Sequence, residues 1–98
     1  MKNALSDYTK RYLDFSNKYY CVLEMVESVR KVSIPREKEK ELDADLVGLK
    51  SNYKDFIGYL MDVVNNPLDV SNKLNTCSVA IISYFEFVKQ DIEEIRGQ

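Results

Sequence analysis

Residues 42–63 read LDADLVGLKSNYKDFIGYLMDV, and their apolar side chains recur at alternating steps of four and three residues. The positions concerned are Leu42, Leu46, Leu49, Tyr53, Phe56, Leu60 and Val63. Because about seven residues make two helical turns, this spacing keeps one face of a helix toward a neighbouring helix. The segment therefore predicts a long helix that packs side by side with others.

Two other stretches of the chain repeat this spacing. The earlier one consists of Leu5, Tyr8, Tyr12, Phe15, Tyr19, Val22, Val26 and Val29. The later one consists of Val70, Leu74, Cys77, Ile81, Tyr84 and Val88, and it reaches Ile95 only by passing over Asp91. Three such runs predict an all-α protein in which each helix contributes one apolar face to a shared core.

Proline-containing segments separate the runs, at residues 33–35 (Ser-Ile-Pro) and 65–67 (Asn-Asn-Pro). Proline disfavours helix in the residue before it and suits the first turn of a new helix. We therefore expect helices at about 4–32, 36–64 and 67–95, within one domain that covers residues 1–98. Short connections force antiparallel neighbours, which predicts an up-down-up three-helix bundle of long helices. The alternative is a helical hairpin that dimerises into a larger bundle.

The composition narrows the possible partners. The 98 residues include 14 basic and 16 acidic side chains, and 45% of them are hydrophobic. This is typical of a folded, helix-rich protein, and the balanced charge gives no strong field toward nucleic acid or an anionic membrane. The densest basic group, in residues 30–40, is interleaved with Glu37 and Glu39. We expect no nucleic-acid partner, and balanced polar faces also disfavour an amphipathic membrane-surface protein.

Targeting signals are not evident. The opening residues, MKNALSD, lack the apolar core of a secretory signal. The densest apolar run, residues 79–88, is ten residues long, whereas a membrane-spanning helix needs about twenty. We expect a cytoplasmic protein with no membrane span.

The two cysteines, Cys21 and Cys77, are expected to be reduced thiols. If the first and third helices run parallel, the two residues are offset along the bundle by roughly 12 Å. A disulfide needs Cα atoms within about 7 Å of each other.

Catalytic chemistry is poorly supported. The chain has no histidine, which removes the usual base at neutral pH and the commonest metal ligand. Its three glycines are too far apart for a phosphate-binding loop, and two distant cysteines do not make a zinc site. The carboxylate pairs Glu24/Glu27 and Asp91/Glu94 have helical spacing and are interpreted as solvated faces. We predict no enzyme activity, cofactor, metal or small-molecule substrate.

Apolar residues outside the three runs are the candidate contact surface. Leu13 and Tyr20 lie seven residues apart on a flank of the first helix. In the third helix, Ile82, Phe85 and Phe87 make the middle apolar nearly all round. No helix of a three-helix bundle is central, so some of these side chains need cover from a partner or a second copy.

Gly48 and Gly58 are a second candidate contact. Each glycine inside a helix costs about 1 kcal/mol relative to alanine, and both are predicted on the outer face of the second helix. Small residues there allow a partner helix to approach closely. The alternative is that this surface has no role.

These features together predict a protein–protein interaction module, such as an adaptor, an inhibitor, an immunity-type protein or a chaperone-like protein. The second hypothesis is a self-assembling structural subunit, a homodimer or larger, that needs no foreign partner.

Overall fold

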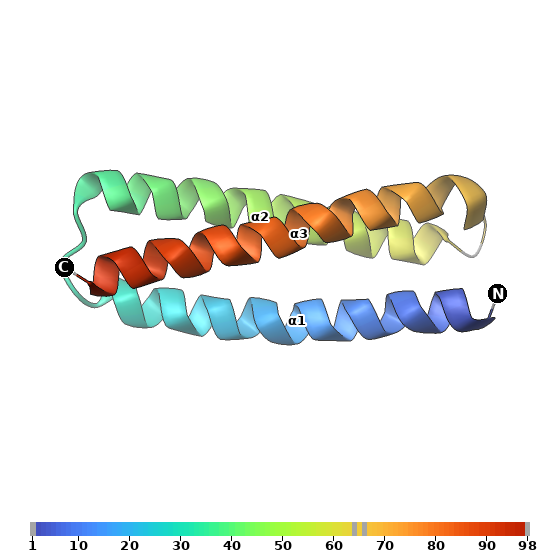
Figure 1. Ribbon diagram of the computed structural model, residues 1–98, viewed down its shortest axis with the longest axis horizontal. Coiled ribbons are helices and arrows are strands. Elements are labelled where there is room, and N and C mark those ends of the chain that lie inside the picture. The colour runs from blue at the N-terminus through green and yellow to red at the C-terminus, as the bar shows by residue number, and fades with distance from the viewer. Residues whose placement is uncertain (1, 64, 66, 98) are drawn as a thin grey trace.

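A computed structural model of the protein describes residues 2–63, 65 and 67–97. Three helices account for nearly all of them: α1 (Lys2–Arg30), α2 (Arg36–Asp62) and α3 (Pro67–Arg96) (Figure 1). The expected up-down-up bundle is confirmed, because α1 and α3 run in the same direction and α2 runs against both. The bundle measures 49 × 19 × 15 Å, close to the length of about 45 Å expected for thirty helical residues. The helical-hairpin alternative is not what the chain adopts.

The helix ends follow local chemistry. α1 ends at Arg30 rather than near residue 32, because the amides of Lys31 and Val32 bond to carbonyls three residues back and tighten the last turn. α2 begins after Pro35, whose carbonyl accepts a hydrogen bond from the Glu39 amide at 3.0 Å. Glu37 and Glu39 in its first turn suit the positive end of the helix dipole. The predicted end of this helix, residue 64, lies outside the described residues.

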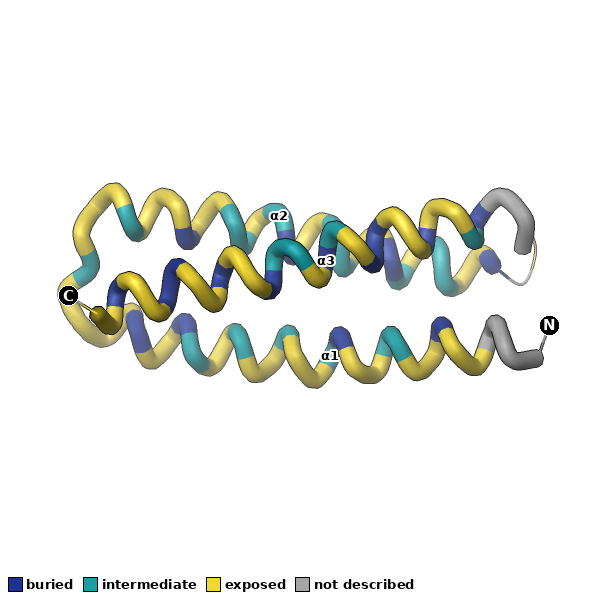
Figure 2. The backbone as a smooth tube through the Cα atoms, viewed as in Figure 1, coloured by how far each residue is buried: buried dark blue, intermediate teal, exposed yellow. Residues whose placement is uncertain are grey.

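The core is built from the apolar runs that the sequence shows. The most deeply buried large side chains are Phe56, Leu42, Leu49, Leu74, Ile81, Ile92 and Val88. Figure 2 shows buried positions recurring along each helix. Phe15 of α1 packs edge-on against Phe56 of α2, with ring centroids 5.3 Å apart, and also meets Phe85 of α3. Full burial of each such side chain contributes about 1.5–3 kcal/mol, so this seam provides most of the stability.

The three helices do not pack equally. α3 contacts α2 much more extensively than it contacts α1, and α1 contacts α2 least. Tyrosines in the α1 seam account for part of this difference, because a buried hydroxyl needs a partner. Tyr8 meets Ser71 of α3 through a hydrogen bond of 2.6 Å, and Ser16 of α1 is hydrogen-bonded to Tyr53 of α2. α1 is therefore held to the bundle partly by polar contacts. By contrast, α2 and α3 share a more extensive contact between apolar side chains.

Candidate functional site

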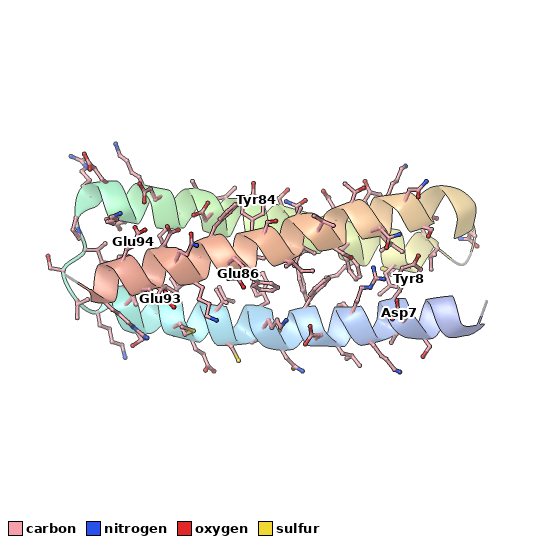
Figure 3. All side chains as sticks on the ribbon, in the orientation of Figure 1. Asp7, Tyr8, Tyr84, Glu86, Glu93 and Glu94 are labelled. Atoms are coloured by element: carbon pink, nitrogen blue, oxygen red, sulfur yellow. The ribbon has the colours of Figure 1, made fainter. Side chains whose placement is uncertain are left out.

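A cavity of about 360 Å³ lies between α1 and α3. Its α1 side is formed by Asn17, Lys18, Cys21, Val22 and Met25, and its α3 side by Ile82, Phe85, Glu86, Lys89 and Ile92. In Figure 3, Glu86 projects from α3 on the side that faces α1.

A second hollow, of about 370 Å³, continues the first toward the other end of the bundle. It is lined by Arg11, Asp14, Phe15 and Lys18 of α1 and by Asn75, Ser78, Val79 and Ile82 of α3. Lys18 and Ile82 border both hollows, so we treat them as one surface and call it the α1/α3 groove. On α1 it extends from residue 11 to residue 25, a distance of about 21 Å along the helix.

Several of the α1 side chains that border the groove are polar or small, beside the apolar Val22 and Met25. Asp14, Asn17 and Cys21 are all exposed, and none of them reaches across as a large apolar residue would. The floor is apolar: Phe85 and Ile92 are buried, whereas Ile82 remains 52% exposed. An apolar strip bordered by polar side chains is the usual anatomy of a protein-binding surface.

Charged side chains of both signs surround the groove. The Arg11 guanidinium ties the helices together near one end, donating to Asn75 Oδ1 at 2.9 Å and to Ser78 Oγ at 3.3 Å. Lys18 pairs with Asp14 one turn earlier, at 3.2 Å. Because the Lys18–Asp14 pair is exposed, it contributes little to stability and both side chains remain able to interact with other groups.

The two cysteines are both free, as expected, but their surroundings differ. Cys21 is exposed and lines the groove, whereas Cys77 is buried in the core. Burial raises the pKa of the Cys77 thiol, and the carboxylate of Asp55 acts in the same direction. Cys21 is therefore the accessible thiol of the pair.

The predicted contact residues divide among several surfaces. Ile82 and Phe85 both line the groove. Phe85 is only 9% exposed and belongs to the core, so the expectation that it is exposed was wrong, and its contact with a partner stays a prediction. The wide buried stripe of a three-helix bundle includes it. Leu13 and Tyr20 are 56% and 68% exposed and are not among the residues that line the groove. Phe87 is exposed and lies five residues from Ile82, about 140° around the helix.

The glycines have different surroundings. The Tyr84 ring of α3 lies against Gly48, where an added Cβ would clash with the ring. Gly48 is thus part of an internal contact between α2 and α3, and its prediction as an outer docking position was wrong. Gly58 is exposed, has nothing within 4 Å of its Cβ position, and lines a hollow with Lys54 and Met61. A role for Gly58 in contacting a partner stays a prediction.

Carboxylates gather between α2 and α3, near the end where α1 joins α2. Glu41 of α2 and Asp91 and Glu94 of α3 bring carboxylate oxygens within 4.8 Å of one another. Asp91 is only 7% exposed, so the interpretation of Asp91 and Glu94 as a solvated pair was wrong for Asp91. The sequence signal was its seam position between Val88 and Ile95. Among the described residues, its buried Oδ2 has no hydrogen-bond partner.

This environment changes the protonation of Asp91. Burial is the largest effect, followed by the neighbouring carboxyl of Asp45 and the charges of Glu41 and Glu94, and together they raise the pKa of Asp91 to about 7. Lys38 of α2 offsets part of the negative charge, with Nζ 2.5 Å from Glu94 Oε2 and 3.7 Å from Glu41 Oε2.

The sequence matches no protein-family model, no curated protein and no solved structure. Within the described residues, no helix has both the length and the apolar content that crossing a membrane requires.

Proposed function

We propose that the protein is a non-enzymatic interaction module of the cytoplasm that receives one amphipathic helix of a partner protein in the α1/α3 groove. The observation that carries the proposal is the apolar floor of the groove, where Ile82 stays half exposed above Phe85 and Ile92. Val22 and Met25 of α1 line the same cavity, yet Ile82 remains 52% exposed.

The groove has the dimensions of a helix-binding site. Its length of about 21 Å corresponds to about 14 residues of helix. Two parallel helices, α1 and α3, form its walls, and a third helix laid between them would turn the three-helix bundle into a four-helix bundle. Partner residues at steps of three and four would meet the floor, as in other helix-in-groove complexes.

The surface area supports the same reading. The accessible surface of the chain is 6826 Å², whereas a compact monomer of its mass is expected to expose about 5,800 Å². The excess of roughly 1,000 Å² is comparable to the 800 Å² or so that each partner buries in a standard interface. The bundle thus exposes about as much extra surface as one binding site removes.

The border of the groove indicates the character of the partner. Arg11, Lys18 and Lys89 are basic, and Asp14 and Glu86 are acidic. A partner helix with flanks of both signs would match this border, while a uniformly basic or acidic helix would meet like charges. Specificity would then come from the flanks and affinity from the apolar stripe.

Cys21 provides a test that needs no engineered cysteine. A photoreactive maleimide on this accessible thiol should cross-link a helical segment of a partner, and Cys77 should stay unlabelled because it is buried. A synthetic peptide of the captured segment should bind with one-to-one stoichiometry in calorimetry. Ile82→Glu should weaken that binding by about tenfold or more, because it places a charge on the apolar floor.

Val47→Glu is the matched control. Val47 is also an exposed apolar residue, but it lies on α2 and does not line the groove. Equal loss of binding in both variants, or none in Ile82→Glu, would contradict the proposal. Circular dichroism of each variant separates lost binding from lost folding.

Self-assembly is the second candidate, and Leu13 with Tyr20 favours it. The two exposed side chains lie on one flank of α1 and are absent from the lining of the groove. A second copy that placed this flank in the groove would form a head-to-tail contact, which extends unless it closes into a ring. Light scattering should then show a mass that rises with concentration and falls back in Tyr20→Glu. A constant monomer mass would exclude this candidate.

A further inference from the structure

The carboxylates between α2 and α3 lie on a different surface from the groove and are not needed for helix binding. Glu41 is in the second turn of α2, and Asp91 and Glu94 precede the end of α3. Figure 3 shows Glu94 projecting toward α2, whereas its neighbour Glu93 lies on the side of α1. The cluster therefore joins the beginning of one helix to the end of another.

The state of Asp91 distinguishes this cluster from an ordinary acidic surface. The residue is 93% buried, since 7% is exposed, and Oδ2 has no hydrogen-bond partner among the described residues while the neighbouring carboxyls are ionised. Asp91 and Asp45 form a side-chain hydrogen bond when one of these two carboxyls is protonated. A buried carboxylate oxygen without a donor is unfavourable, and such groups are paired, protonated or bound to a metal in most proteins. With both carboxyls ionised, Oδ2 thus lacks a positively charged or donating partner.

Lys38 does not satisfy this requirement. Its ammonium group lies beside Glu94 and Glu41, at 2.5 and 3.7 Å, and the described contacts include none from Lys38 to Asp91. Four carboxyl groups, of Glu41, Asp45, Asp91 and Glu94, lie near one another, and Lys38 pairs with two of them, Glu41 and Glu94. Even with Asp91 protonated, negative charge exceeds positive charge at this position.

The donor set selects the class of cation. All the donors are carboxylate oxygens, which favour hard cations over zinc, copper or iron. Two oxygens on one ion can be no farther apart than twice the bond length, which is about 4.2 Å for Mg²⁺ and about 4.6–5.2 Å for Ca²⁺. The oxygens here lie within 4.8 Å of one another, a spread that Ca²⁺ accommodates without movement of the helices.

We propose that Asp91, Glu41 and Glu94 bind a calcium ion between α2 and α3, with Oδ2 of Asp91 as the buried ligand. Asp45, one turn after Glu41, is placed to provide a fourth carboxylate. The ion displaces the Lys38 ammonium from Glu94 and takes over its charge balance. Because the ligands come from two helices, binding holds the end of α3 against the beginning of α2.

Calorimetry and thermal unfolding with CaCl₂ test the proposal on the metal-free protein. The titration should reach about 10 mM, above the dissociation constants of about 10⁻⁴–10⁻³ M of weak calcium modules. We expect heat of binding and a rise in Tm with CaCl₂, and a smaller rise with MgCl₂ at equal ionic strength. Asp91→Asn should weaken calcium binding by about tenfold or more, since it removes the buried charge.

Two further variants make the test specific. Lys38→Gln should strengthen calcium binding, because the competing ammonium group is gone. Glu93→Gln removes the same charge as Glu94→Gln from an adjacent residue outside the cluster, so its affinity should equal that of the wild type. If Asp91→Asn does not fold, Glu94→Gln and Glu41→Gln at exposed positions carry the test instead.

The proposal is overturned if CaCl₂ gives neither heat nor a change in Tm. It is also overturned if Glu94→Gln and Glu93→Gln respond alike, because the effect is then general charge screening. The two sites can be tested independently by measuring binding of the partner peptide to Ile82→Glu and to Asp91→Asn. Ile82→Glu should weaken peptide binding, whereas Asp91→Asn should not, so failure of the groove proposal is distinguishable from failure of the calcium proposal.

Discussion

The contact between α2 and α3 and the contact between α1 and α3 are built on the same spacing of apolar residues, yet one is close and the other open. At the first contact, Tyr84 packs directly onto Gly48, and the seam includes fully buried apolar side chains such as Leu49 and Leu74. At the second, exposed polar residues such as Asn17 line a groove. The seam determines which faces meet, and the residues beside the seam determine how closely they meet.

The largest difference in the free energy of unfolding should appear between replacement of a core leucine at the α2–α3 contact and replacement of an exposed leucine on α1. Leu74 is fully buried in the core, so Leu74→Ala should lower the free energy of unfolding by about 2–5 kcal/mol. Leu13 on α1 is exposed, and Leu13→Ala should change the free energy of unfolding by no more than about 0.5 kcal/mol. Chemical denaturation followed by circular dichroism measures both. Similar losses would show that α1 is as well packed as its neighbours.

A second test uses the pH dependence of stability at the α2–α3 contact in calcium-free buffer. Asp91 faces Glu41 and Asp45 of α2 and Glu94 of its own helix, and its pKa is raised from 3.8 to about 7 in the folded state. The nearby ammonium of Lys38 pairs with Glu94 and Glu41. Between these two values the folded protein keeps a proton that the unfolded chain releases. Stability must therefore fall as pH rises through this window and level off above it.

The comparison with Asp91→Asn isolates this effect from the other carboxylates. From pH 4 to pH 7, the wild type should lose roughly 3 kcal/mol relative to the variant, an order-of-magnitude value from the linkage relation. Denaturation curves at several pH values give the difference. A constant difference across the range would mean that Asp91 titrates normally.

Hydrogen exchange compares the helices directly. Because α1 has the fewest contacts with the rest of the bundle, its central amides should exchange through an opening that leaves α2 and α3 intact. We expect this opening to require about 1–2 kcal/mol less than global unfolding. Uniform protection of all three helices would contradict the unequal packing.

The two glycines of α2 should give the smallest effects, with different outcomes. Gly58→Ala should stabilise the protein by about 0.5–1 kcal/mol, since nothing obstructs the new methyl group. Gly48→Ala gains the same helix propensity but must displace the Tyr84 ring, so it should fall short of Gly58→Ala by about 1 kcal/mol. In a Tyr84→Ala background the two substitutions should become equivalent.

The fold could be predicted from the sequence because the apolar spacing and the prolines act locally. The spacing placed the buried faces of all three helices, and Pro35 and Pro67 marked where helices begin. The helix ends were less accurate, as at Arg30, because the last turn depends on hydrogen bonds that no spacing encodes.

The candidate sites needed the structure, because they depend on the axial alignment of different helices. The spacing cannot show that Tyr84 lies over Gly48, or that Glu41 lies beside Asp91. Phe85 was misassigned for a related reason, since the width of the buried stripe depends on how near the other helices are. Asp91 alone carried a local signal, a carboxylate at a seam position, which pointed to a buried charge.

The unequal packing also has a consequence for the order of folding. α2 and α3 are neighbours in the chain and share the extensive contact, so their pairing closes only a short loop. α1 meets α3 through contacts that are far apart in sequence, such as Tyr8 with Ser71. Contacts of this kind are slower to form. We therefore expect α2 and α3 to assemble first as a hairpin, onto which α1 docks last.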